Sequence, residues 1–228
     1  MLKPVIPSLP SRLLSSTIAR FTRNQDGMAA IEFAFIAPVM LFMYFGMSEV
    51  ATAISVDRRV SHSANVAGDL TTQSETVSAA EMTEIMTATM MVMGIPRDKQ
   101  DGVTIEITSY VRNADDSVDS NGRALLKGSN GIDFPSFNPA NLDEHILSKS
   151  SGVVVARVNY AYEPLKLRYM TTDVNLTEVF MLKPRKSINV AILDPSGSNN
   201  YSCDFSGGGA GLNNGLGDPN CTPSGSVP

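Results

Sequence analysis

Hydrophobic residues gather in one long stretch near the start of the chain. Residues 27–56 read GMAAIEFAFIAPVMLFMYFGMSEVATAISV, which exceeds the roughly 20 apolar residues that a helix needs to cross a bilayer. One carboxylate, Glu32, stands close to the start of this stretch. An acid inside a membrane costs about 2.5–3.5 kcal/mol on insertion scales, so its presence there indicates a function. The pattern predicts a transmembrane helix over residues 28–56.

Helical patterns continue after the apolar stretch. Apolar residues recur irregularly over 50–67, which predicts that the helix continues until Gly68 and the run TTQSET break it. Ser78, with Glu81 three residues later, is typical of a capping box at the start of a second helix. Glycine and proline within 94–96 are expected to end that helix.

The rest of the chain contains three segments with the alternating pattern of β-strands, at 103–111, 153–162 and 187–193. A polar insertion, 112–150, separates the first two. The residues after 194 are rich in Gly, Asn, Ser and Pro, and such a segment buries too little apolar surface to order itself. These elements predict an α+β fold in which a small, antiparallel sheet packs against the N-terminal helices.

The length of 228 residues allows one modest soluble domain beside a membrane anchor. We divide the chain into five parts. They are a cytoplasmic leader (1–27), a transmembrane helix (28–56), extracytoplasmic helices (57–95), a small β-rich domain (96–198) and a Gly/Asn-rich, disulfide-looped tail (199–228).

Charges on either side of the span predict its orientation. Four basic residues precede it within 1–26, and basic residues prefer the cytoplasmic side of a membrane. Arg58 and Arg59, just past the span, favour the opposite orientation. On balance we expect a single-pass protein with a cytoplasmic N-terminus and with residues 57–228 outside.

The two cysteines, Cys203 and Cys221, both lie near the C-terminus. They are spaced to close a loop of about 15–20 residues, which in an oxidising compartment stabilises a fold by about 3 kcal/mol. A disulfide there agrees with an external location for the domain. The alternative is a pair of free thiols in a flexible tail.

The start of the apolar stretch carries a resemblance to a known family. The run DGMAAIEFA at 26–34 is followed by Pro38 and by an apolar segment that ends in Gly46 and Glu49. This combination, within residues 20–60, resembles the TadE-like family, which comprises minor pilins or pseudopilins of the tight-adherence (Tad, Flp-type IV) pilus system. The resemblance implies a type IV pilin-like plan, with the protein in the bacterial inner membrane and its C-terminal domain in the periplasm.

The resemblance also implies roles for individual residues. In the family a prepilin peptidase cuts after a glycine, and a glutamate followed by an aromatic residue stands fifth in the mature chain. Cleavage is therefore expected between Gly27 and Met28, with Glu32 and Phe33 as the glutamate and the aromatic residue of the family pattern.

Cleavage at that bond would leave an ammonium group at Met28, one helical turn from Glu32. The family resemblance implies that this carboxylate meets the terminal amine of a neighbouring subunit, which offsets both charges in a low-dielectric setting. The alternative is that Glu32 lies shallow enough to reach headgroups and water, with no partner. Pro38 removes a helix hydrogen bond and is expected to kink the span.

Three classes of function are compatible with this organisation. The first is a structural minor pilin or pseudopilin whose partners are the inner membrane, the prepilin peptidase, other Tad pilins and inner-membrane assembly components. The second is an uncleaved bitopic scaffold that recruits a secretion or adhesion partner through its periplasmic domain. The third is a hydrolase released by signal peptidase after Ala51-Thr52-Ala53. The mature N-terminus separates them, because it would be Met28, Met1, or Ser55 and its neighbours.

The sequence offers little support for enzyme chemistry, a cofactor, a metal or a small-molecule substrate. His62 and His145 have no second His or Cys at metal-ligand spacing. Asp115, Asp116 and Asp119 lack the glycine and the distal glutamate of an EF-hand. No nucleophile elbow, P-loop or dinucleotide fingerprint is present. We therefore expect no enzyme activity.

Two further patterns argue against binding functions. The net charge of −5, without a basic block, argues against nucleic-acid binding. Residues 194–198 match D-x-S-x-S, the opening metal-binding motif of von Willebrand A domains, but only 30 residues follow it. We interpret that motif as the end of a strand and a turn.

Overall fold

The computed structural model describes residues 27–164, 174–192, 200–205 and 219–223. Residues 1–26 of the predicted leader and the motif at 194–198 lie outside the described residues. The chain divides into two compact units, 1–48 and 49–228. Helix α2 (Met28–Thr72) contributes its first part to one unit and its second part to the other.

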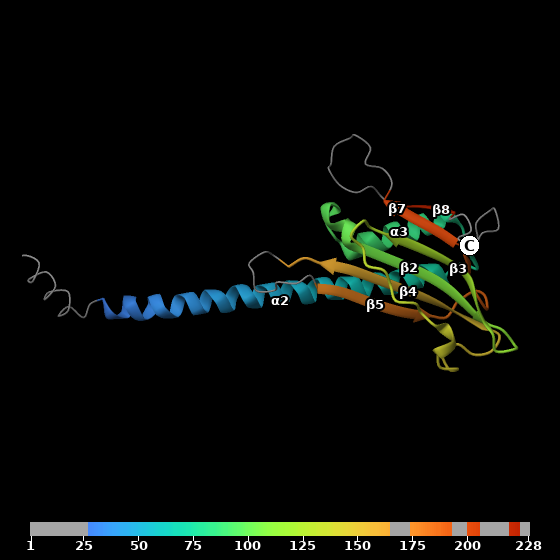
Figure 1. Cartoon of the computed structure of the whole chain (residues 1–228), viewed down its shortest axis with the longest axis horizontal. Helices are drawn as coiled ribbons and strands as arrows, with labels where there is room; N and C mark the ends of the chain where they lie inside the picture. Colours follow the sequence, from blue (N-terminus) through green and yellow to red (C-terminus); the bar gives the residue numbers. More distant parts are fainter. Residues whose placement is uncertain (1–26, 165–173, 193–199, 206–218, 224–228) are drawn as a thin grey trace, which may run out of the picture. The chain divides into compact units, whose positions relative to one another are not determined.

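The described part of the first unit is the beginning of α2, drawn in blue in Figure 1. By length and composition α2 qualifies as a membrane span, and the most apolar stretch of it has no buried residue. Large apolar side chains such as Phe35 (76% exposed) and Met47 (70% exposed) point away from any protein core. An apolar surface of this extent calls for a non-aqueous environment or a partner.

In the second unit, two helical segments pack on one face of a sheet. The second part of α2 turns Val56, Val60, Ala64 and Ala67 toward the core, at the spacing of three and four residues that keeps side chains on one helix face. Helix α3 (Ala79–Met93) adds buried methionines to the same core. Figure 1 shows both helical segments on one side of the strands.

Gly68 does not break the first helix, which contradicts the expectation from sequence. The helix continues to Thr72. A Cβ at Gly68 would overlap the side chain of Leu182 and lie 3.5 Å from the Cβ of Ala156. The glycine therefore lets the helix approach the sheet closely, and close packing outweighs its low helix propensity.

Helix α3 begins and ends as predicted. The hydroxyl of Ser78 accepts a hydrogen bond from the backbone N–H of Glu81, and the Glu81 carboxylate accepts the backbone N–H of Ser78 at 2.8 Å. At the other end, Gly94 adopts a left-handed conformation with φ of 61°. The capping box and the glycine stop are thus both confirmed.

Replacing Ser78 with alanine tests the contribution of this cap. The change removes the acceptor for a helix N-terminal N–H, so we expect the free energy of unfolding to fall by about 1 kcal/mol. Urea denaturation of the full chain in detergent, followed by circular dichroism, measures the effect. Ser129→Ala, at an exposed serine in the loop after the strand Val118–Lys127, serves as the control and should leave the midpoint unchanged.

The main sheet has six strands in the order β5-β4-β2-β3-β7-β8. Their bounds are β2 (Val103–Arg112), β3 (Val118–Lys127), β4 (Ser151–Tyr162), β5 (Val174–Leu182), β7 (Asn200–Phe205) and β8 (Pro219–Pro223). All neighbours run antiparallel except β3 and β7, which run parallel. Short elements complete the described fold: β1 (Thr76–Val77), the 3₁₀ turns η1 (Arg97–Gly102) and η2 (Pro139–Asn141), and β6 (Ala191–Ile192).

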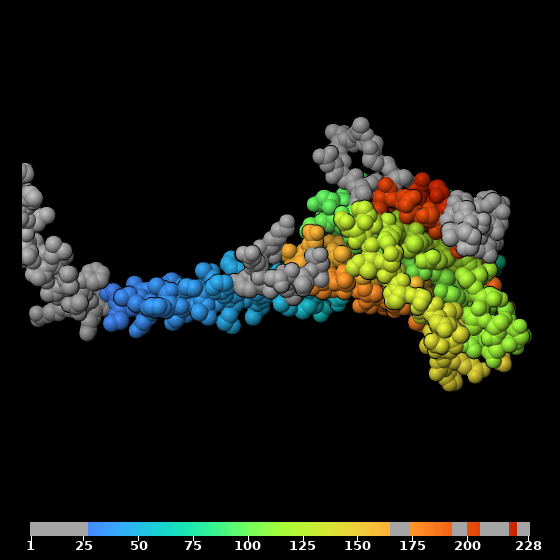
Figure 2. All heavy atoms as spheres, in the orientation of Figure 1, coloured from blue at the N-terminus to red at the C-terminus, as the bar shows by residue number. Residues whose placement is uncertain are grey.

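Each face of the sheet has its own cover. Val103, Ile105 and Ile107 of β2 face the helices, as their alternation predicts. On the opposite face, Leu147 from the segment 128–150 packs with Val153 and Val155 of β4. Figure 2 shows part of that segment, in yellow-green and yellow, on the face turned to the viewer. The α+β plan with an antiparallel-rich sheet is confirmed.

Three predictions about the β-region are wrong in detail. Of the predicted strand 187–193, residues 187–192 are described, and within them only β6 is a strand; it pairs with β1 outside the main sheet. The polar insertion 112–150 contains β3, whose outer positions are largely exposed and hide its strand pattern. The tail contributes β7 and β8, because β3 offers a backbone edge with which β7 pairs. Hydrogen bonding to an existing sheet orders a segment that has few apolar side chains of its own.

Candidate functional site

The residues at the predicted processing point form the first turn of α2. The backbone N–H of Ile31 donates to the carbonyl of Gly27 at 3.1 Å, so Gly27 caps the helix. Met28 is 54% exposed and Phe33 is 68% exposed. Glu32 is exposed as well, and it lies one helical turn after Met28. Gly27, Met28, Glu32 and Phe33 are therefore together at an exposed helix start.

Gly27 is a glycine that no close contact requires. Among the described residues, a Cβ at this position would meet nothing within 4 Å, and other residue types fit a helix N-cap as well as glycine does. Glycines that are needed for structure in this chain look different, as Gly68 and Gly94 show. Packing among the described residues thus does not explain the residue type at position 27.

Pro38 lies inside α2, where it has no backbone N–H to donate to the carbonyl of Ala34. The kink that this missing hydrogen bond favours stays a prediction. Glu49, at the other end of the apolar stretch, is only 6% exposed, and its Oε1 has no hydrogen-bond partner among the described residues.

The two cysteines form a disulfide in the structure. Cys203 of β7 and Cys221 of β8 stand directly opposite each other in the antiparallel pair. Both are buried, at 1% and 5% exposure. The bond thus joins two strands of the sheet instead of closing a loop in a free tail.

The candidate metal ligands do not converge. His62 and His145 are both exposed. Among the described residues, no group of three or more His, Cys, Asp or Glu side chains could hold a metal ion. Asp116 is instead paired with Arg112 and Lys149 at 3.1 Å each, and these hydrogen bonds lower the pKa of its carboxyl. Hydrogen bonds from Ser117 likewise lower the pKa of Asp115.

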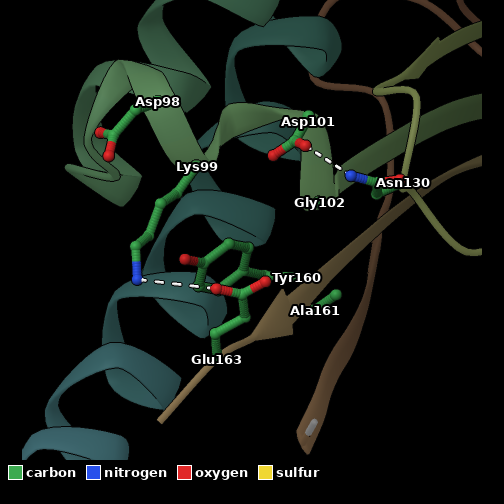
Figure 3. A pocket seen from close by; sticks show the side chains of 8 residues that line it. All are labelled: Asp98, Lys99, Asp101, Gly102, Asn130, Tyr160, Ala161 and Glu163. Atoms are coloured by element: carbon green, nitrogen blue, oxygen red, sulfur yellow. Dashed lines mark hydrogen bonds and ion pairs between the residues drawn. The ribbon is translucent and has the colours of Figure 1, made fainter. Parts of the chain in front are cut away.

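A polar hollow of about 310 Å³ lies in the second unit, between η1 and the end of β4. Figure 3 shows its main polar side chains, which come from Asp98, Lys99, Asp101, Asn130, Tyr160 and Glu163. Asn130 Nδ2 donates to Asp101 Oδ2 at 2.5 Å. The ammonium of Lys99 stands 4.0 Å from Glu163 Oε2, with both side chains substantially exposed.

A second, apolar hollow of about 200 Å³ shares Lys99, Tyr160 and Glu163 with the first. Its other lining residues come from α2, from the turn after α3 and from the end of β4; they are Thr52, Val56, Arg59, Gly94, Ile95, Pro96 and Tyr162. The guanidinium of Arg59 donates to the carbonyl of Gly94 at 3.4 Å. This hollow combines an apolar wall with a basic side chain.

Tyr160 lies where the two hollows meet. The residue is 4% exposed, and its side chain lines both hollows. Burial, followed by the charge of Glu163, raises the pKa of Tyr160 to about 12. Burial also raises the pKa of Tyr162. Both hydroxyls are therefore protonated at neutral pH and available as donors.

Alternation along residues 153–162 puts Tyr160 and Tyr162 on the same strand face as Val158, but it does not indicate the hollows. One signal was available: two hydroxyl-bearing side chains end an otherwise aliphatic strand face, directly before Pro164. The contribution of Arg59 and Lys99 could not be seen, because they are 40 residues apart and meet only through the turn after α3.

The structure is consistent with a single-pass membrane protein, because the part of the chain that it describes contains one candidate span followed by an α+β domain. Within this chain, residues 27–69 match the family model of TadE-like protein. The match begins at Gly27, covers about a fifth of the chain and confirms the resemblance of this segment. No curated protein and no solved structure matches the chain.

Proposed function

We propose that this protein is a minor pilin or pseudopilin of a Tad (Flp-type IV) pilus, with a structural and not an enzymatic role. Its first helix anchors it in the bacterial inner membrane, with the N-terminus in the cytoplasm and the α+β domain in the periplasm. A prepilin peptidase removes the leader by cutting between Gly27 and Met28. The mature chain then joins other Tad pilins and inner-membrane assembly components.

The observation that carries this proposal is the combination at the start of α2. The match to the TadE-like model begins at Gly27, and no close contact within the described residues requires a glycine there. The match supports a link to the Tad pilus in general. A glycine that packing does not require supports a role as a recognition element for a peptidase, which reads small residues in an accessible backbone.

The orientation follows from charge. The basic leader favours a cytoplasmic N-terminus, and the buried disulfide between Cys203 and Cys221 suits the oxidising periplasm. Arg58 and Arg59 follow the span on the periplasmic side and weaken the charge bias. The two signals nevertheless agree on the same side for the domain.

The N-terminal sequence and intact mass of the membrane-extracted protein test the proposal. Expression with the matching prepilin peptidase should give a chain that starts at Met28, and expression without it should give a chain that keeps its leader. Gly27→Val should block the cut, because a branched side chain replaces the small residue at the cleaved bond. Gly46→Ala is the matched control, since this glycine of α2 also has no neighbour within 4 Å of a Cβ.

Two results would contradict the proposal. A leader retained in the presence of the peptidase would favour an uncleaved scaffold that recruits a partner through its periplasmic domain. A start near Ser55 would indicate release by signal peptidase and would remove the membrane anchor altogether.

A further inference from the structure

Two of the residues that line the apolar hollow are basic, Arg59 and Lys99, and one is acidic, Glu163. Lys99 and Glu163 lie 4.0 Å apart and largely offset each other. Arg59 contacts the carbonyl of Gly94 but forms no ion pair with an acid among the described residues. A guanidinium with free N–H groups is well suited to a phosphate, which it binds through two parallel hydrogen bonds.

The hydroxyl of Tyr160 adds a hydrogen-bond donor to the residues that line this hollow. Figure 3 shows its ring beside the side chains of Lys99 and Glu163. Tyr160 is 4% exposed as a residue, and its side chain lines the hollow. A tyrosine hydroxyl can donate a hydrogen bond to an oxygen acceptor that enters such a hollow.

The rest of the hollow is apolar. Val56, Ile95 and Tyr162 are each less than a tenth exposed, and Pro96 completes the wall. A small inorganic anion would leave this surface unused. A ligand with an anionic group next to a hydrocarbon portion would contact the basic side chains, the Tyr160 hydroxyl and the apolar wall together.

The chain itself keeps the hollow near a membrane. Thr52 and Val56 belong to the predicted span, 28–56, and Arg59 follows it by three residues. Even fully extended, three residues reach only about 10 Å. The headgroup layer of a bilayer is about 5–8 Å thick on each side. Lipid phosphates are therefore the most abundant anions within reach of Arg59.

We propose that the apolar hollow binds the headgroup phosphate of an anionic phospholipid. Arg59 and the Tyr160 hydroxyl hold the phosphate, with Lys99 as a second cation, and the first carbons of an acyl chain lie against Val56, Ile95 and Tyr162. The inference rests on the membrane-spanning part of the proposed function. It does not depend on processing at Gly27.

Native mass spectrometry of the full chain in a neutral detergent, titrated with phosphatidylglycerol, tests this site. The unaltered protein should retain one lipid. Arg59→Gln should weaken retention by about tenfold, as expected for loss of a charge-assisted pair. Tyr160→Phe removes one oxygen and should weaken it by about threefold to tenfold. Arg58→Gln is the matched control, because this neighbouring arginine does not line the hollow, and it should change retention by less than about twofold.

Several outcomes would overturn the proposal. Equal losses in the Arg58 and Arg59 variants would indicate general surface attraction and no defined site. Displacement of the lipid by an equal concentration of inorganic phosphate would indicate a free-anion site. Absence of retained lipid in the unaltered protein would also overturn it. Circular dichroism of each variant checks folding, and Tyr160→Phe tests the site without removing a charge.

The same samples separate this inference from the proposed function. A chain that starts at Met1 and retains lipid through Arg59 supports the lipid site while contradicting pilin processing. A chain that starts at Met28 and binds no lipid supports pilin processing and contradicts the lipid site. Recovery of the protein from the soluble fraction would contradict both.

Discussion

Replacing Arg157 with methionine should lower the free energy of unfolding of the second unit by about 3–5 kcal/mol, because it leaves a buried carboxylate without its closest partner. Arg157 Nη2 lies 2.5 Å from Glu106 Oε2, and the two side chains are 9% and 4% exposed. The two residues stand opposite each other in the β2–β4 register. Methionine keeps the apolar stem of the side chain and removes only its charge and its donors.

The guanidinium of Arg157 has further partners that the change would also remove. Its Nη1 donates to the carbonyl of Pro135 at 2.7 Å. The group lies 4.7 Å from the centre of the Phe134 ring and 5.8 Å from that of Phe137. Arg157 therefore holds the segment after β3 against the sheet as well as neutralising Glu106, so its loss should also expose that segment to proteolysis.

Arg123 provides the matched control for this prediction. It contacts the same carboxylate, at 2.9 Å from Oε1 of Glu106, but its side chain is 47% exposed. Water and salt screen such a pair, so Arg123→Met should cost about 1 kcal/mol or less. Urea denaturation of the full chain in detergent compares the two variants. Equal effects would contradict the prediction, because they would mean that burial does not decide the cost.

A double replacement separates charge from packing. If the cost comes from an uncompensated buried carboxylate, combining Arg157→Met with Glu106→Gln should recover a large part of the stability lost in the single variant. If the cost comes from the lost contacts to Phe134 and Phe137, the double variant should be no more stable than Arg157→Met alone.

The pair also illustrates what the sequence could not reveal. Glu106 lies between Ile105 and Ile107, and Arg157 lies between Ala156 and Val158. A charged residue that alternates with aliphatic ones in a strand usually faces solvent. Both are buried because residues 128–150 fold back over this face. That cover is a long polar segment with no strong periodicity of its own, so local pattern could not predict it.

Elements with strong local signals were predictable. The span, the capping box at Ser78 and the strands at 103–111 and 153–162 each depend on neighbouring residues in the sequence. Gly68 has the same local appearance as a helix-ending glycine, and only its contact with Leu182 distinguishes it. The strands of the tail likewise depend on pairing with β3. Their first paired residues, Arg123 and Asn200, are 77 residues apart in the sequence.

The two candidate sites also differ in whether the local sequence could predict them. The features at 27–33 are contiguous in sequence, so they could be proposed from it and aligned with a family model. The apolar hollow combines α2, the turn after α3 and the end of β4. The hollow forms through contacts between residues far apart in the sequence, so no short sequence motif predicts it.

Replacing Glu32 with glutamine should have opposite effects on membrane insertion and on assembly. Glutamine removes the charge but keeps the size, so insertion of the span should become easier, because an ionised acid costs about 2.5–3.5 kcal/mol in the bilayer. Assembly should become weaker. If the carboxylate meets the terminal ammonium of a neighbouring subunit, its loss leaves that ammonium buried and unpaired, at a cost of about 2–5 kcal/mol.

The expected result is therefore a protein that is present in the membrane at normal or higher levels, is still cut after Gly27, and supports few or no pili. Membrane fractionation, N-terminal sequencing and pilus counts measure the three properties separately. Asp57→Asn is the matched control, since it removes an acid from the same helix beyond the predicted span. Because a simple defect in insertion or processing would lower the first or second property, only loss of the inter-subunit charge pair lowers the third alone. Normal pilus counts in the Glu32→Gln strain would mean that this acid reaches headgroups and water without a partner.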